Sequence, residues 1–508
     1  MKLLNARKKL VTLAIASAIS GGVMVSAPAQ AMNVSQNNVG QVLLFPYYTV
    51  KNGFDTVFTV TNTTNKTAIF KIRFREALNS REVLDFNVIM SPYDHWSAAV
   101  TKDAAGTGAV VRTFDNTCTS PDKPKWNATG TGGYEAPFFT DLFSNQYADG
   151  ATTATTRVQE GYFEVILMGV STDSVTDPTN VIAYNAKHVG GVPRNCAVVD
   201  SALETSATIT DATNDCSGVV GDDEGCFTGP ENILKGHVTY IDVASGKAVD
   251  AEPTAIEEWI EAGNAHIIAP AADVNPTLAS GTANTAVWGF NNGQVAGDGA
   301  GDSVVVDQVS GLLMANSVIN EYATGTGAAT SWVLTFPTKH FYTDAYTSAG
   351  TTSGTVGIDP FAEWFYKGTA AGTGMSCDTI QVSYVNREEG PDSTPTGTGF
   401  SGRGGSITPP TEICYEVNVL DFNGTSVFGS ATNRTAISTA AAGSAGWASV
   451  DLTIATDGGE NLVVGTSTFT GLPVIGFAAV MRDAGSSVAN YGSNIAHTIE
   501  SGMPIVTP

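Results

Sequence analysis

The sequence has few charged residues, and basic residues are the scarcer kind. Charged residues make up 15% of the 508 residues, with 25 Lys and Arg against 49 Asp and Glu, so the formal net charge is −24. A chain with so few cations neutralises few phosphates, so we expect no nucleic-acid partner. After residue 31 there is also no apolar run of the roughly 18–20 residues that a membrane helix needs, so we expect no transmembrane segment.

Recognisable catalytic motifs are missing as well. The six histidines form neither HxH nor HExxH, and no GxSxG occurs. There is no CxxC, so neither a zinc knuckle nor a redox motif is indicated. These absences favour a non-enzymatic protein and leave a secreted hydrolase with an unfamiliar site as the weaker alternative. Apolar residues nevertheless make up 42% of the chain, which is enough to form a sizeable core.

Residues 1–31 have the pattern of a secretory signal peptide. Basic residues precede an apolar stretch that ends near residue 25, and residues 29–31 read Ala-Gln-Ala, an A-x-A cleavage site. A membrane anchor is the alternative, but the run is short and rich in small residues. Cleavage would remove four positive charges and no acidic residue, which takes the net charge from −24 to −28. We expect an exported protein, secreted or on the cell surface, with the periplasm still open.

The cysteine count fits an exported chain, because an even number of cysteines in an oxidising compartment predicts disulfides. Six are present: Cys118, Cys196, Cys216, Cys226, Cys377 and Cys414. Six cysteines allow 15 pairings. Proximity in the sequence favours Cys216–Cys226 and Cys377–Cys414, which leaves Cys118–Cys196.

Five short segments recur in the same order along the chain, which predicts an internal duplication. The matched segments are VLLFP at 42–46 and VLTFP at 333–337, DTVFTV at 55–60 and DTIQVS at 378–383, VLDFN at 83–87 and 419–423, WSAAV at 96–100 and WASV at 447–450, and GYFEVILMG at 161–169 and GLPVIGFAAV at 471–480. The alternative is that unrelated β-strands share a Val-, Thr- and Phe-rich composition. We expect Trp96 and Trp447, which belong to the repeat, to pack in the core.

The recurring segments alternate apolar and polar residues between polar turns, which indicates β-strands. In the segment 68–76, AIFKIRFRE, one face is apolar and the other basic, as in a half-buried antiparallel strand. We therefore predict a mainly β protein with two related immunoglobulin-like antiparallel β-sandwich domains, at 32–189 and 329–508. The Cys…Trp…Cys pattern of true immunoglobulin domains is not present.

The interval 190–328 predicts a mixed α+β insertion between the sandwiches. Residues 236–248 indicate a hairpin with its turn at 244–247. A short helix is expected over 252–262, because Thr254 suits an N-cap and Gly263 a stop. A second helix is expected over 303–322, where apolar residues recur at helical spacing.

Two groups of residues are candidate binding sites. Acidic clusters in polar loops offer the oxygen ligands that Ca²⁺ prefers, although neither matches an EF-hand loop and solvated surface charge is the alternative. These calcium candidates are Asp222, Asp223, Glu224, Asp298 and Asp302. Trp126 and Trp364 lie in segments specific to one copy and are the candidate ligand contacts, through aromatic stacking on a glycan.

The sequence thus predicts a structural, adhesive or assembly component of a bacterial-type cell surface or extracellular matrix. Its partners would be other copies of itself or other cell-surface components. An exported glycan- or small-ligand-binding protein is the alternative.

Overall fold

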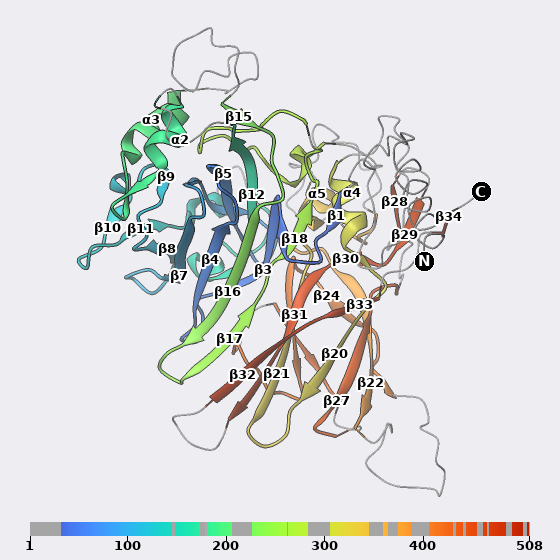
Figure 1. The fold of residues 1–508 in the computed structure, drawn as a ribbon. Helices are drawn as coiled ribbons and strands as arrows, with labels where there is room; N and C mark the ends of the chain where they lie inside the picture. Colours follow the sequence, from blue (N-terminus) through green and yellow to red (C-terminus); the bar gives the residue numbers. More distant parts are fainter. Residues whose placement is uncertain are drawn as a thin grey trace, which may run out of the picture.

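The computed structural model describes residues 32–144, 148–172, 178, 180–205, 226–261, 263–282, 305–344, 359–363, 374–387, 406–429, 433–439, 443–454, 461–464, 467–483, 490–500 and 505–506. In these residues the chain forms two β-sandwiches that lie against each other, with short helices on the side of the first sandwich (Figure 1). The prediction of a mainly β protein built from antiparallel sandwiches is confirmed.

The first sandwich consists of two eight-stranded sheets. We call one the β12 sheet: β1 (Asn33–Val34), β18 (Thr254–Glu257), β3 (Val42–Thr49), β12 (Glu160–Ser171), β5 (Ala68–Glu76), β6 (Glu82–Met90) and β9 (Cys118–Ser120), with β15 (Phe227–Thr228) beside β12. The other is the β4 sheet: β10 (Asn127–Ala128), β11 (Tyr134–Pro137), β8 (Ala109–Thr113), β7 (His95–Lys102), β4 (Asp55–Asn62), β16 (Leu234–Asp242) and β17 (Lys247–Ala251), with β2 (Val39–Gly40) beside β16.

The second sandwich is smaller. Its β27 sheet contains β23 (Ser406–Ile407), β22 (Asp378–Asn386), β27 (Ala445–Asp451), β20 (Ser317–Ala323) and β33 (Thr498–Glu500), with β24 (Thr411–Ile413) beside β22. Its β31 sheet contains β26 (Arg434–Ile437), β25 (Val417–Phe422), β21 (Ala328–Thr335), β31 (Ile475–Asp483) and β32 (Asn490–Ala496). β25 and β26 are parallel, whereas the other ladders in these sheets are antiparallel.

Short strands and helices complete the described residues. The remaining strands are β28 (Asn461–Val464), β29 (Ser467–Thr470), β34 (Ile505–Val506), β13 (His188–Val189), β14 (Val192–Pro193), β19 (Met314–Ala315) and β30 (Leu472–Pro473). The helices are α2 (Val181–Ala186), α3 (Cys196–Thr205), α4 (Val305–Leu313) and α5 (Lys339–Thr343), with 3₁₀ turns η1 (Lys123–Lys125), η2 (Asp141–Ser144), η3 (Thr155–Gln159) and η5 (Leu278–Ser280). None of the described helices is long and apolar enough to cross a membrane.

The core of the first sandwich is aromatic. Phe45 of β3 stacks on Phe163 of β12 with ring centroids 4.2 Å apart, and Phe58 of β4 packs on Phe163 from the opposite sheet at 4.8 Å. Trp96 of β7 is fully buried beside them. Offset and edge-on ring contacts of this kind stabilise a core beyond the area that they bury.

Helices cover the outer face of the β12 sheet, so both faces of its central strands are buried. Ile69 and Met168 pack under α2 and α3, while Val42 and Ile166 pack under α4. As a result every residue of β5 and β12 is buried. The expectation that the basic face of 68–76 meets solvent is therefore wrong, because the segment that follows β18 covers it with backbone carbonyls. Lys71 Nζ donates to the Ala271 carbonyl at 3.2 Å.

The hydrophobic core of the first sandwich extends into the second, which also has a separate core of its own. Alternate residues of the β31 sheet face opposite ways, so that Trp332 packs inside the second sandwich and its neighbour Val333 packs against the first. Phe477 of β31 stacks on Tyr240 of β16 with centroids 5.4 Å apart. At the edge of this contact a Cβ on Gly492 of β32 would lie 1.9 Å from the carbonyl oxygen of Ala248 in β17, so only glycine fits there.

The predicted hairpin is confirmed, because β16 and β17 pair antiparallel, although the turn lies at 243–246, one residue earlier than expected. Of the two predicted helices, the one over 252–262 is wrong. Residues 254–257 instead form strand β18, which pairs with β3 and buries Ala255 and Ile256. Strand pairing at an open sheet edge outweighs the weak local preference for a helix.

The helix predicted over 303–322 is right only in its first half. Helix α4 ends at Leu313, and Ser317–Ala323 forms β20 between β27 and β33. The strands of the interval 190–328 thus join the sandwiches on either side: β15 to β18 belong to the first sandwich and β20 to the second.

All five matched segments of the sequence repeat lie in strands, and two of their pairings recur. β3 pairs with β12 as β21 pairs with β31, and β4 pairs with β7 as β22 pairs with β27. The VLDFN strands differ: β6 lies between β5 and β9, whereas β25 lies between β21 and β26. The two sandwiches therefore agree in part of their strand order.

Candidate functional site

Most of the predicted binding residues lie outside the described residues. These are the calcium candidates Asp222, Asp223, Glu224, Asp298 and Asp302 and the ligand candidate Trp364. Cys216, the expected disulfide partner of Cys226, also lies outside the described residues. The described candidate, Trp126, follows η1 and is half-buried. Its ring packs edge-on against Phe86 at 4.9 Å, and its Nε1 donates to the Pro121 carbonyl at 3.1 Å. Through these contacts Trp126 holds the η1 turn against the sandwich.

Two of the predicted disulfides are confirmed. Cys118 of β9 is bonded to Cys196 at the start of α3, and Cys377 is bonded to Cys414. Cys226 is also disulfide-bonded. The Cys118–Cys196 bond fixes α3 over the β12 sheet, and the Cys377–Cys414 bond joins the residue before β22 to the residue after β24.

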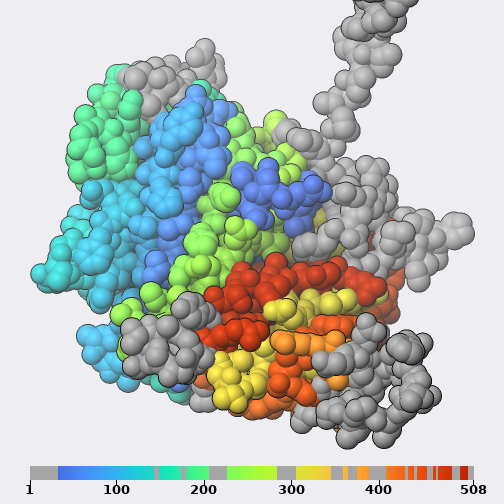
Figure 2. All heavy atoms as spheres, turned by 60° about the horizontal axis from the view of Figure 1, so that its bottom comes forward, coloured from blue at the N-terminus to red at the C-terminus, as the bar shows by residue number. Residues whose placement is uncertain are grey.

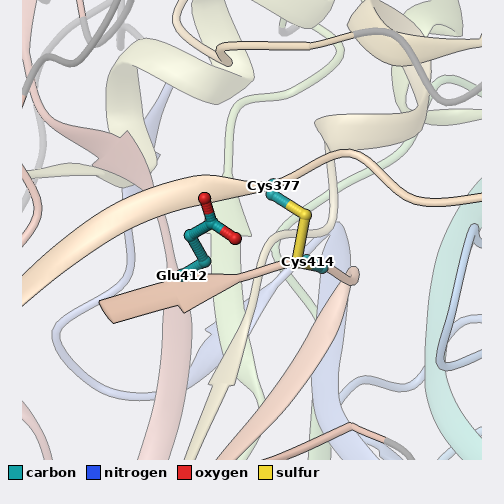
Figure 3. A group of neighbouring side chains, drawn as sticks. All are labelled: Cys377, Glu412 and Cys414. Atoms are coloured by element: carbon teal, nitrogen blue, oxygen red, sulfur yellow. A yellow bond between two sulfur atoms is a disulfide. The ribbon is translucent and has the colours of Figure 1, made fainter. Parts of the chain in front are cut away.

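Glu412 lies beside the Cys377–Cys414 disulfide, and the three side chains form a compact group (Figure 3). The two sulfur atoms are bonded to each other, and a metal needs cysteine as the thiolate. That leaves the exposed carboxylate of Glu412 as a single ligand. The group is therefore a structural disulfide and has no capacity to hold a metal ion.

An exposed aromatic side chain marks the outer face of the β27 sheet. Trp447 of β27 is 46% exposed, and its neighbours across the strands are Val385 of β22 and Glu321 of β20. The next row along the strands consists of small or half-buried residues, Ser383, Ser449, Ile319 and Thr498. The third row is polar: Gln381, Asp451, Ser317 and Glu500. We call these three rows the Trp447 face.

The exposure of Trp447 corrects the expectation that it packs in the core like Trp96. In WSAAV the valine follows the tryptophan by four residues, whereas in WASV it follows by three. Val100 and Val450 are both buried. Because successive strand residues point to opposite faces, the missing residue turns Trp447 outward while Trp96 stays inside. Counting residues between the two positions in the sequence would have revealed this difference.

A second cluster of functional interest is a set of buried charges between the sandwiches, centred on Arg157 in the middle of η3. Its guanidinium contacts Glu76 Oε1 at 2.8 Å and Asp149 Oδ2 at 2.5 Å. All three side chains are at most 1% exposed. Arg81 extends the cluster, with Nη1 lying 2.5 Å from Oδ2 of Asp344 next to α5. We call these five residues the junction cluster.

The loop between β5 and β6 carries the junction cluster into the second sandwich. Oε2 of Glu76 accepts the backbone N–H of Leu78 at 2.8 Å, which fixes the loop. The backbone N–H groups of Glu416 and Val417 then donate to the carbonyls of Leu78 and Ala77 at 3.1 and 3.0 Å. The loop therefore joins the sandwiches by backbone bonds as well as by ion pairs.

The electrostatics of the junction follow from burial and pairing. Burial alone would raise the pKa of Asp149, but its bonds with Arg157 lower that pKa overall. Burial raises the pKa of the Glu416 carboxyl well above its usual value, and nearby Lys339 and Arg75 offset only part of this effect. Burial also lowers the pKa of His340 well below its usual value. Burial therefore favours the uncharged forms of Glu416 and His340, whereas pairing with Arg157 favours the ionised form of Asp149.

Sequence reasoning missed the junction cluster, and it also missed a separate buried ion pair, between Glu164 and Arg75, for which one signal was present. Glu164 interrupts the apolar run GYFEVILMG, and in the structure its Oε1 lies 3.1 Å from Nε of Arg75 on the neighbouring strand. A charge within a long apolar strand indicates a buried ion pair, because an unpaired charge there would be too costly. The identity of the partner could not be read from the sequence.

Comparison with known proteins assigns no family to the chain. No protein-family model matches the sequence, and neither the curated proteins nor the solved structures gave a match. The Trp447 face and the junction between the sandwiches are the features of the described residues that bear on function.

Proposed function

We propose that the protein is an exported, non-enzymatic structural and adhesive component of a bacterial-type cell surface or extracellular matrix. The observation that carries this proposal is the junction between the sandwiches, which combines a continuous core with buried ion pairs. The signal-like sequence at 1–31 supports export, and the duplicated strand segments support a modular origin.

The junction makes a rigid unit of the two sandwiches. Phe428, which follows β25, packs against Tyr47 of β3 with centroids 5.1 Å apart, and its carbonyl accepts the side-chain amide of Asn52 at 2.7 Å. Arg434 of β26 lies 3.4 Å from the buried carboxylate of Glu160 in β12. Contacts between domains that move are usually more polar and less extensive. A core-like junction suits a scaffold that holds its shape rather than a clamp that closes on a substrate.

Location and assembly of the native protein test this proposal. Cell fractionation with immunogold microscopy should place the protein outside the cell envelope, against a periplasmic marker as the control. Light scattering of the mature protein, with and without Ca²⁺, should show mass that grows with concentration. A monomer under all conditions, confined to the periplasm, would contradict the proposal.

Two variants of the acidic clusters test whether these residues bind Ca²⁺ in the light-scattering experiment. One variant replaces Asp222, Asp223 and Glu224 by the corresponding amides, and the other replaces Asp298 and Asp302 by Asn. If Ca²⁺ promotes assembly through one cluster, only that variant should lose the response to Ca²⁺. A response that survives in both variants would exclude these residues as the calcium ligands.

An exported glycan-binding protein is the second candidate function. The Trp447 face favours it, because an exposed tryptophan beside small polar residues is a suitable surface for a sugar ring.

A further inference from the structure

We infer that the Trp447 face binds an uncharged pyranose oligosaccharide, with the indole of Trp447 stacking on one sugar ring. This inference rests on the proposed adhesive function and names the class of ligand that such an adhesin would hold. Figure 2 shows that yellow and orange residues of the second sandwich reach the surface of the molecule.

The shape of the Trp447 face suits a sugar ring. Trp447 is 46% exposed at the centre of three paired strands, and the row next to it is formed by Ser383, Ser449 and Ile319. Ser383 and Ser449 are much shorter than the indole, so they leave room beside the ring. A pyranose presents a flat face of C–H groups and a rim of hydroxyls, so it can cover the ring and reach polar neighbours at once. Tryptophan supplies a large rigid contact area at small entropic cost.

Polar groups on the Trp447 face lie where they can bond the hydroxyls of a saccharide. Glu321 lies directly across from Trp447, and Asp451 lies four residues along the same strand. Four residues of strand span about 13 Å, so the face has room for a few sugar units. Gln381 and Asp451 are paired across β22 and β27, and they place amide and carboxylate groups at the far end of the face. Such groups orient hydroxyls by hydrogen bonds.

The charge of the Trp447 face favours an uncharged ligand. Strands β20, β22, β27 and β33 place the carboxylates of Glu321, Asp451 and Glu500 on this face. Among the described residues of this sheet and its strand ends, Arg387, one residue beyond β22, is the basic residue next to it. An excess of carboxylates repels uronic acids, sulfated glycans and nucleic acids. An uncharged saccharide meets no such penalty. A protein partner fits less well, because a stable protein interface buries about 1,600 Å² around an apolar centre.

Binding measurements with defined oligosaccharides test the inference. The probes are cellohexaose, chitohexaose and mannohexaose, titrated into the mature protein up to about 10 mM by calorimetry and tryptophan fluorescence. At least one should bind, with an affinity that salt does not change, because an uncharged ligand makes no ion pairs. Trp447→Ala should lower that affinity by about tenfold or more, as expected when a large aromatic contact side chain is removed.

Two variants control for folding and for non-specific stacking. Trp447→Phe should recover part of the affinity, because it keeps an aromatic ring. Phe114→Ala removes a side chain that is 61% exposed on the first sandwich, and it should bind as the wild type does. Thermal unfolding should show that all three variants fold.

Several results would overturn the inference. These are no binding of any probe by the wild type, equal affinities for the wild type and Trp447→Ala, or binding only of acidic polysaccharides that salt abolishes. A Trp447→Ala variant that loses self-association but never bound sugar would mean that the face contacts another copy of the chain. Sugar binding through Trp447 by a monomeric periplasmic protein would support the inference and contradict the proposed cell-surface role.

Discussion

Replacing Arg157 by Met would measure what the junction cluster contributes to stability. The substitution keeps an unbranched side chain of similar length and removes the charge. In the structure Arg157 is fully buried, and its guanidinium bonds to both Glu76 and Asp149. It also lies over the ring of Phe143, with the guanidinium carbon 4.4 Å from the centroid. The variant therefore leaves two buried carboxylates without their shared cation.

The expected loss follows from the groups that remain. Removing one partner of a buried ion pair costs about 3–5 kcal/mol, because the other charge stays buried. Backbone N–H groups still bond Glu76, and the side-chain amide of Asn79 still bonds Asp149 at 2.9 Å. These donors keep the loss from exceeding that range. We expect Arg157→Met to lower the free energy of unfolding by about 3–5 kcal/mol.

Equilibrium unfolding in urea, followed by tryptophan fluorescence, is the assay. The shared core predicts a single transition for both sandwiches. Arg112→Met is the matched control, because Arg112 forms an ion pair with Glu135 near the surface. The side chain of Arg112 is 40% exposed and that of Glu135 is 22% exposed. Exposed pairs of this kind contribute less than about 1 kcal/mol.

Equal stabilities of the two variants would refute the reasoning, since the same substitution would then cost the same in a buried and in an exposed pair. A further variant, Arg157→Met with Asp149→Leu, removes one of the two carboxylates as well. It should lose less stability than the sum of the two single substitutions, because the groups interact. Strict additivity would show that Arg157 and Asp149 do not stabilise each other.

Two further predictions concern pH and the disulfides. Because burial raises the pKa of Glu416 in the folded state, the folded protein holds a proton that the unfolded chain releases, so stability falls as the pH rises through that folded-state pKa. Glu416→Gln should flatten this fall in unfolding free energy as the pH rises above the usual pKa of 4.5, and a pH profile parallel to that of the wild type would contradict this prediction. Replacing both Cys377 and Cys414 by Ala should lower the unfolding free energy by about 4 kcal/mol, given the 37-residue separation that the bond closes. Urea unfolding checks the value, and a loss below about 1 kcal/mol would show that the unfolded chain gains little freedom without this bond.

The sequence predicted the features that depend on local spacing. Alternating residues indicated the strands, the turn at 244–247 gave the hairpin, and the 37-residue separation of Cys377 and Cys414 pointed to their bond. Each of these depends on residues close together in the chain, where periodicity and turn chemistry are informative.

The wrong predictions depended on what lies opposite each segment. Residues 254–257 became a strand because β3 offered a free edge, and the basic face of β5 became buried because a later segment covers it. The junction cluster brings together Glu76 and Asp344, which no local pattern connects. Trp447 is the exception, because the spacing to Val450 already contained the answer.

The shared core also has a consequence for the order in which the chain folds. Strand β31 lies near the C-terminal end of the described residues, yet Phe477 completes the aromatic cluster around Tyr240 and Phe428. During synthesis from the N-terminus, the apolar flank of the first sandwich stays uncovered until β31 has been made. Uncovered apolar surface of this kind promotes aggregation. A chain that stays unfolded until its last strands have emerged would avoid this hazard. A truncated chain that lacks β31 would leave the apolar flank of the first sandwich uncovered permanently.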